Sequence, residues 1–205
     1  DHSANKDNLD GKSIKEFCED NEIYFLLEVP AVEIAGMEGR FRLFDPRHGY
    51  HLIKRINSDY VKMCLDFEHM LSHKLDPDKV IDDLPSDAGK KVLLFHLGKP
   101  VPYGGVVHKP IMLGSRAQEI IYRWLYKLQQ KGMDKAYILF ERGSGQTPKE
   151  VFEESVQSMR QIAAFLDKGI KPDDLPPEFY GLAIENRAKF QRQLVSVREH
   201  AFDPL

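Results

Sequence analysis

Two kinds of segment alternate along the chain. Continuous apolar runs occupy residues 23–27, 61–65, 92–95 and 137–140, and helical spacing of apolar side chains fills 13–19, 50–56, 76–84, 116–130 and about 147–168. Apolar runs without polar alternation predict strands buried on both faces, which is typical of parallel sheets. Pro46 marks the start of the helix that includes 50–56, and Gly169 marks the end of the helix over about 147–168. Strands alternating with helices predict right-handed crossovers between parallel strands.

This order predicts an α/β fold of the (β/α)₈ TIM-barrel type. Residues 22–168 would supply about four parallel βα units, and residues 169–205 a C-terminal extension with a last helix near 185–200. We expect residues 1–205 to form a single domain. A closed barrel typically needs about 250 residues, so the chain is about four units short. The missing half of the barrel, or an oligomeric partner, is therefore expected to complete it.

Each predicted strand ends on, or is followed directly by, a residue that can bind a metal or move a proton. These residues are Glu28, Asp66, His96 and Glu141. Barrel active sites are built at the carboxyl ends of strands, and a cation can partner several charged groups there at once. The set predicts one divalent ion (Mn²⁺, Mg²⁺, Co²⁺ or Zn²⁺), with oxygen-preferring metals favoured because no thiolate is expected among the ligands. The simpler alternative is a row of polar strand ends that meet water.

Three further residues are candidates for binding a substrate. His69 follows Asp66 by three positions, so that a tight turn or a first helical turn would aim both inward. His108 lies in the loop after His96, and Lys99, just beyond His96, would meet an anionic substrate. For each of the three, a packing or solvent-facing role is the simpler alternative.

Composition excludes several classes of function. The net charge of −3 and the pI near 6.3 argue against a nucleic-acid partner, which usually needs a basic face. No apolar run approaches the ~20 residues that span a bilayer. Cys18 and Cys64 form neither a disulfide framework nor a CxxC metal pattern, and Cys64, inside an apolar run, is predicted to be a buried core thiol. The expected location is the cytoplasm.

The ordered motifs resemble the second half of the xylose-isomerase-like TIM-barrel superfamily. That group includes ketose 3-epimerases, inosose dehydratases and zinc-dependent apurinic-site endonucleases. The resemblance covers about residues 22–168 and is carried by a glutamate after the first apolar strand, Cys-Leu-Asp-Phe-Glu-His ending at His69, a histidine after Val-Leu-Leu-Phe, a glutamate after Tyr-Ile-Leu-Phe, and His-Lys-Pro-Ile-Met-Leu-Gly from His108.

The resemblance to the isomerase and epimerase branch implies a role for each motif residue. Glu28, Asp66, His96 and Glu141 would hold one metal ion, the two glutamates would exchange a substrate proton, and His69 would hold an oxygen of a small carbohydrate. This division of labour is chemically reasonable, because a metal polarises a carbonyl while opposed carboxylates remove and return a proton.

Two other functions stay open at this stage. A metal-dependent phosphodiesterase of the apurinic-site endonuclease type would use three zinc ions and an Asp-x-His pair, but Val106 stands at the aspartate position before His108. A non-catalytic subunit that supplies half of a barrel is the other alternative. The expected function is a metal-dependent sugar or polyol isomerase, epimerase or related lyase.

Overall fold

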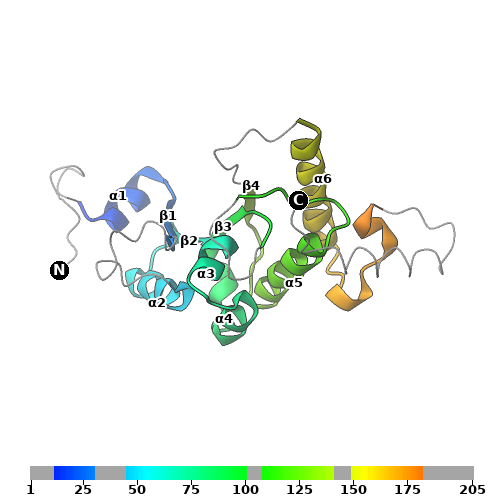
Figure 1. Cartoon of the computed structure of the whole chain (residues 1–205). Helices are drawn as coiled ribbons and strands as arrows, with labels where there is room; N and C mark the ends of the chain where they lie inside the picture. The colour runs from blue at the N-terminus through cyan, green and yellow to red at the C-terminus, as the bar shows by residue number, and fades with distance from the viewer. Residues whose placement is uncertain (1–11, 31–44, 101–107, 141–148, 182–205) are drawn as a thin grey trace.

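The computed structural model describes residues 12–30, 45–100, 108–140 and 149–181 (Figure 1). Its strands are β1 (Phe25–Glu28), β2 (Val61–Asp66), β3 (Val92–Leu97) and β4 (Tyr137–Phe140). Its α-helices are α1 (Ile14–Asn21), α2 (Pro46–Ile56), α3 (Phe67–Ser72), α4 (Pro77–Asp83), α5 (Arg116–Gln130) and α6 (Lys149–Asp167). Short 3₁₀ turns lie at η3 (Ala88–Lys91), η4 (Pro172–Asp174) and η5 (Pro177–Tyr180).

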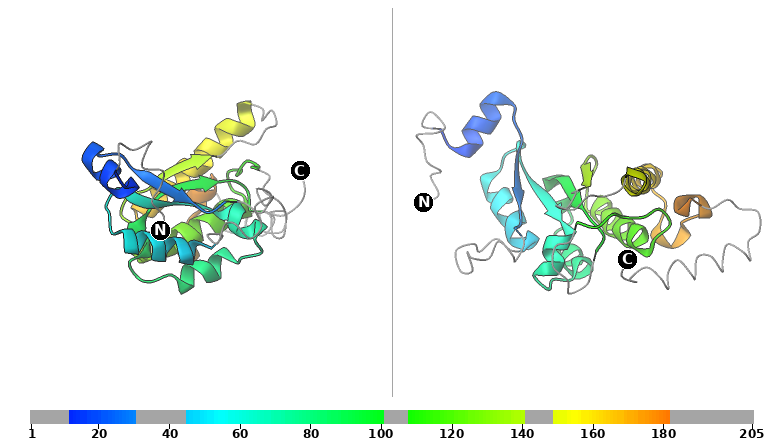
Figure 2. Two further views of the ribbon diagram at one scale, coloured as in Figure 1. Left: turned by 90° about the vertical axis from the view of Figure 1, so that its left-hand side faces the viewer. Right: turned by 45° about the horizontal axis from the view of Figure 1, so that its top comes forward.

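The four strands form one parallel sheet in the order β1-β2-β3-β4. Figures 1 and 2 show helices α2, α4 and α5 along one side of this sheet, so each crossover returns over the same face. Parallel pairing in sequence order was predicted and is confirmed. The described residues thus form four βα units of a TIM-barrel-type α/β fold, with β1 and β4 at the two edges of the described sheet.

Local sequence explains where the helices begin and end. Asp45 caps α2 by accepting a hydrogen bond from the backbone N–H of Arg47 at 2.9 Å, and Pro46 fits the first helical turn, where its missing N–H costs nothing. Ser115 caps α5 in the same way. Gly169, with φ of 64°, follows α6 in the left-handed conformation that glycine adopts easily, as the sequence predicted.

The hydrophobic core lies between the sheet and these helices. Met63, Leu65, Phe95 and Leu97 alternate along β2 and β3 toward the helices, and each is at most 1% exposed. Helix α5 contributes a stripe of buried side chains to the same cluster, namely Ala117, Ile121, Tyr122, Trp124, Leu125 and Leu128.

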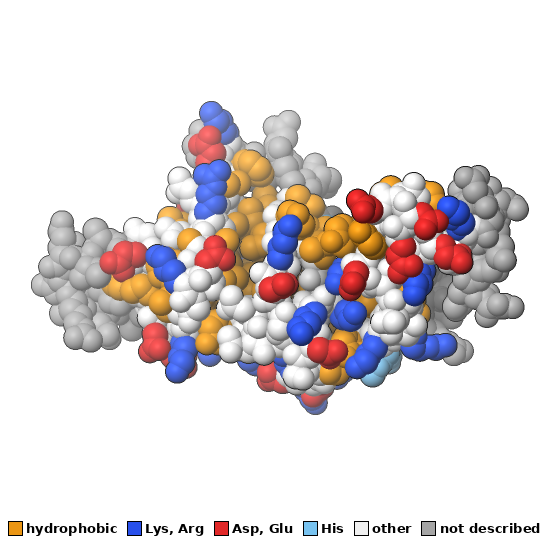
Figure 3. All heavy atoms as spheres, turned by 180° about the vertical axis from the view of Figure 1, so that it is seen from behind, with side chains coloured by type: hydrophobic (Ala, Val, Ile, Leu, Met, Phe, Trp, Pro, Cys, Tyr) orange, Lys and Arg blue, Asp and Glu red, His pale blue; other side chains and the backbone are white. Residues whose placement is uncertain are grey.

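The prediction that all four strands are buried on both faces is wrong for the edge strands. Phe25 on β1 is 41% exposed, and Tyr137 and Leu139 on β4 are 55% and 50% exposed. Both β4 residues are in register with residues of the β3 face that points away from the core, Leu94 and His96. Figure 3 shows hydrophobic side chains at the surface beside the protruding helix α6. Apolar patterning alone cannot tell an edge strand from a central one, because both bury at least one face.

The helix expected near residues 185–200 lies outside the described residues. Within residues 12–30, 45–100, 108–140 and 149–181, no helix combines the length and apolarity needed to cross a membrane.

Candidate metal and substrate site

The polar residues at the carboxyl ends of the strands lie on the sheet face opposite the core. Glu28 ends β1 and Asp66 ends β2, while His96 is the next-to-last residue of β3. Glu28 is in register with Cys64, and Asp66 with His96. Registered partners in a parallel sheet point to the same side, as do residues two apart in one strand. All four side chains therefore share one face and one end of the sheet.

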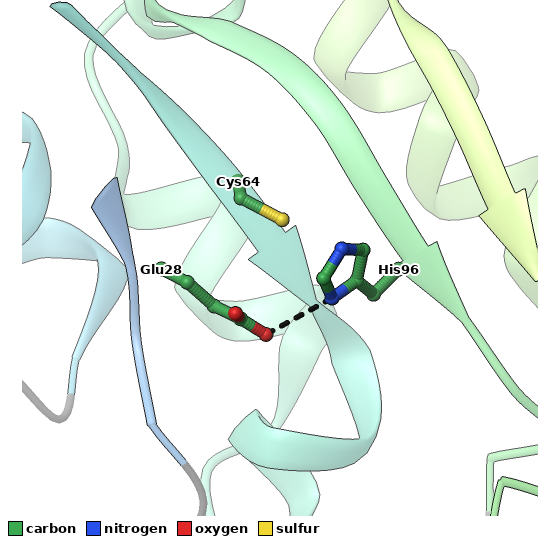
Figure 4. A group of neighbouring side chains, drawn as sticks. All are labelled: Glu28, Cys64 and His96. Carbon is green, nitrogen blue, oxygen red and sulfur yellow. Dashed lines mark hydrogen bonds and ion pairs between the residues drawn. The ribbon is translucent and has the colours of Figure 1, made fainter. Parts of the chain in front are cut away.

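The carboxylate of Glu28 lies at the centre of this group. Its Oε1 is 3.1 Å from Nδ1 of His96 and 3.3 Å from Nδ1 of His69 (Figure 4 shows the first contact). Residues from β1, β3 and α3 thus converge on a single oxygen. Glu28 is partly open to solvent, with its side chain 34% exposed, whereas the side chains of His69 and His96 are 10% and 16% exposed.

His69 is held in one orientation by backbone contacts. Asp66 caps α3 by accepting a hydrogen bond from the His69 backbone N–H at 3.0 Å, which confirms that a first helical turn follows the strand. Nδ1 of His69 lies 2.8 Å from the carbonyl oxygen of Val29. A carbonyl oxygen can only accept, so Nδ1 carries the proton. Nε2 is left facing Asp66 Oδ2 at 3.6 Å.

Among the described residues, two groups of three side chains have donor atoms close enough to share a cation. Glu28, Cys64 and His96 form one, and Glu28, Asp66 and His69 form the other; within each group the donor atoms lie within 4.8 Å of one another. Glu28 belongs to both. Glu141, the fourth predicted ligand, lies outside the described residues, as does Val106.

Cys64 is buried, as predicted, at 2% exposure. Its side chain, however, lies on the face that carries Glu28 and His96 and not on the face packed against the helices. The sequence contained the signal for this, because Cys64 stands two positions before Asp66 and side chains two apart on a strand share a face.

His108 does not contact Glu28 but faces Glu68, one residue before His69. Nδ1 of His108 is 3.5 Å from Glu68 Oε2, and the Glu68 side chain is only 3% exposed. The chain comes close here because position 98 is glycine: a Cβ on Gly98 would overlap with the Glu68 carboxylate. Glu68 was not predicted, since a glutamate in a short helix gives no sign in sequence that it is buried.

Two lysines lie near the site, one after β3 and one on the same sheet face nearer the amino ends of the strands. The backbone N–H of Lys99 donates to the carbonyl of Lys109 at 2.8 Å, which joins the two ends of the segment after β3. Lys62 lies on the same sheet face as Cys64, toward the amino ends of the strands, and its Nζ donates to the Lys90 carbonyl. Burial, together with the nearby charge of Lys91, lowers the pKa of Lys62.

Of the known proteins compared with the chain, solved structures gave the matches. No family model matches the chain, and no curated protein matches it. The chain is similar to D-psicose 3-epimerase crystallised in the presence of D-fructose, at 18% identity and a TM-score of 0.41, over 90% of this chain and 50% of that one. It is also similar to D-psicose 3-epimerase with D-tagatose from Clostridium cellulolyticum H10, at 16% identity and a TM-score of 0.41. That similarity covers 92% of this chain and 53% of the other.

The chain therefore spans about half the length of these structures. The fold class rests on the strand order and register of the chain itself, and similarity at this level assigns it no activity.

Proposed function

We propose that this chain supplies the metal- and substrate-binding strand ends of a divalent-metal-dependent sugar or polyol isomerase or epimerase. The observation that supports this is the convergence of His69 and His96 on Glu28 Oε1, at 3.3 and 3.1 Å, at the carboxyl end of a parallel sheet. Such an edge is where barrel enzymes place their chemistry.

The donor set fits one divalent ion. In this proposal Glu28, Asp66 and His96, with Glu141 from the end of β4, hold Mn²⁺, Mg²⁺, Co²⁺ or Zn²⁺. Carboxylate and imidazole donors suit these ions. A carboxylate oxygen of Glu28 lies within 4.8 Å of donor atoms from β2, β3 and α3. When bound, the ion would polarise the substrate carbonyl and stabilise the charge that develops on its oxygen.

The chain's own residues would bind the substrate and move its proton. Glu28 would remove or return a proton on one face of the substrate carbon and Glu141 on the other. His69 would hold a substrate oxygen. The Val29 carbonyl fixes the orientation of its ring for this role. His108 and Lys99, at the two ends of the segment after β3, would contact the remainder of the carbohydrate.

The activity belongs to the completed barrel. The chain has four strands in its described sheet, and its neighbours among solved structures are about twice as long. The preceding half of the barrel or an oligomeric partner would supply the rest of the pocket, and with it the choice of sugar.

Solvent deuterium incorporation tests the proposal. The metal-loaded, assembled protein would be incubated with ketohexoses in D₂O, and label would be expected at the isomerised carbon, because an abstracted proton exchanges with water. Glu28→Gln keeps the shape of the side chain and removes its basic site, so turnover should fall by about 10²–10⁴-fold. Glu22→Gln is the matched control, since Glu22 is an exposed glutamate outside the site.

The outcomes separate the three functions. Carbon-bound label that depends on Glu28 supports the isomerase. Cleavage of abasic DNA without label would reject it in favour of the phosphodiesterase. Neither signal, in a metal-loaded and assembled sample, would reject both enzymes and leave the non-catalytic subunit.

A further inference from the structure

We propose that Cys64 is a sulfur ligand of the cation that Glu28 and His96 bind, so that the site selects a borderline-soft ion such as Zn²⁺ or Co²⁺ over Mg²⁺. This inference rests on the proposed metal site and specifies its chemistry. It differs from the expectation from sequence, which favoured oxygen-preferring metals because no thiolate was expected among the ligands.

The backbone places the thiol beside both partners. Cys64 is in register with Glu28 across the β1–β2 pair, and its neighbour on β3, Leu94, lies two residues before His96 on the same face. The register shift between Met63 and Cys64 brings this stretch of β2 into line with β3. The fixed positions of three adjacent strands, and not a flexible loop, therefore determine how close these side chains lie.

The donor atoms converge as a ligand set requires. Cys64 Sγ, a carboxylate oxygen of Glu28 and a ring nitrogen of His96 all lie within 4.8 Å of one another, and Figure 4 shows the three side chains directed toward a common point. Zinc–ligand bonds are about 2.0–2.3 Å long, so ligand atoms around one ion stand about 3–4 Å apart. Small rotamer adjustments would close the difference.

The position is also hard to explain by packing alone. Met63 and Leu65, on either side of Cys64, point into the helix-covered core and belong to its hydrophobic cluster. Cys64 points away from that cluster, to the face where Lys62 and Asp66 also lie. If this position only had to fill space, alanine or valine would do so equally well. A thiolate, in contrast, binds Zn²⁺ and Co²⁺ strongly and Mg²⁺ poorly.

Cobalt binding provides a direct readout of sulfur coordination. A Co²⁺–thiolate bond gives a near-ultraviolet charge-transfer band that oxygen and nitrogen ligands alone do not give. The chain has two cysteines, so Cys18→Ala, a change in helix α1, leaves Cys64 as the one thiol and serves as the matched control. The variants to compare are the wild type, Cys18→Ala, Cys64→Ala and the conservative Cys64→Ser, each checked for folding by circular dichroism.

The band should appear in the wild type and in Cys18→Ala, and disappear in both Cys64 variants. Zn²⁺ should bind Cys64→Ser at least about tenfold more weakly. Mutating a residue that only hydrogen-bonds to a metal ligand already costs about 10–100-fold in affinity, and Cys64 would be a ligand itself. Mg²⁺ affinity should stay the same. Because Cys18→Ala retains an unmodified site, its spectrum tests the proposal even if a Cys64 variant fails to fold.

Failure of this inference can be distinguished from failure of the proposed function. Cobalt bound without the band, or a band that persists in Cys64→Ala, would overturn the sulfur ligand and leave the metal-dependent isomerase standing. A band without deuterium exchange would keep the ligand and reject the activity. Absence of any Co²⁺ or Zn²⁺ binding would overturn both.

Discussion

Replacing Tyr122 with phenylalanine tests how the last described helices are held behind the sheet. The Tyr122 side chain projects from α5 and is completely buried. Its hydroxyl donates to the carbonyl oxygens of Phe165, at 3.0 Å, and Ile170, at 2.5 Å, where α6 ends. The ring packs edge-on against Phe179, with centroids 5.0 Å apart. One hydroxyl thus connects α5 to the end of α6 and the turn that follows.

The structure sets the size of the effect. Tyr122→Phe keeps the ring but removes the donor to one buried acceptor, the Phe165 carbonyl, and one partly buried acceptor, the Ile170 carbonyl. The loss should cost about 1–3 kcal/mol of unfolding free energy. Burial also raises the pKa of Tyr122 to about 12 from an ordinary value of 10.0. The contribution of the neutral phenol is therefore complete below pH 10 and is lost as pH rises toward 12.

Thermal unfolding at pH 7, together with urea unfolding from pH 7 to pH 12, measures both effects. At pH 7 the variant should melt about 2–4 °C lower for each kcal/mol lost. The free-energy difference between wild type and variant should then shrink as pH rises above 10. Tyr126→Phe is the control at pH 7, since Tyr126 stacks on Tyr122 but is only partly buried. Equal stability at pH 7, together with an unchanged alkaline slope, would refute the reasoning.

Other predictions concern packing and charge. Gly98→Ala should lower the free energy of unfolding by about 1–3 kcal/mol, because its Cβ would overlap with the Glu68 carboxylate. Gly49→Ala in α2 meets only ordinary contacts and should raise it by about 0.5–1 kcal/mol. Equal shifts of the two variants in thermal melts would contradict this. Burial opposes ionisation of Asp78, but hydrogen bonds, the largest from Lys127, outweigh it and lower its pKa below 3.8. The resulting stability is present above that value and is lost as pH falls through the folded pKa, so acid unfolding of Asp78→Asn should depend less steeply on pH; an unchanged slope would contradict it.

Elements with strong local signals could be predicted from sequence. Helix α5 has the predicted bounds, because a serine cap precedes a long stripe of apolar residues, and β4 coincides with its apolar run. The exposure of Tyr137 and Leu139 could not be predicted in the same way. Whether the second face of a strand is covered depends on elements far away in the chain, or outside it.

The candidate site was predictable where topology alone decides it. Glu28, Asp66 and His96 share one end of the sheet because parallel strands align their carboxyl ends. Which of these side chains come within reach of one another depends on strand register and side-chain rotamers, which cannot be read from the sequence. In the structure Asp66 groups with His69, and His96 groups with Cys64. The roles of all these residues stay predictions until metal and substrate binding are measured.

Metal binding by the purified chain tests the central claim most directly. After chelation and dialysis, calorimetric titration with Zn²⁺, Co²⁺ and Mn²⁺ should show one cation per chain, and at 100 times its dissociation constant the cation should stabilise the fold by about 2.7 kcal/mol. His96→Ala should abolish both the binding and the stabilisation, while His51→Ala, at an exposed histidine on α2, should change neither. No heat of binding, with the same melting temperature in the presence of metal and of chelator, would contradict the claim.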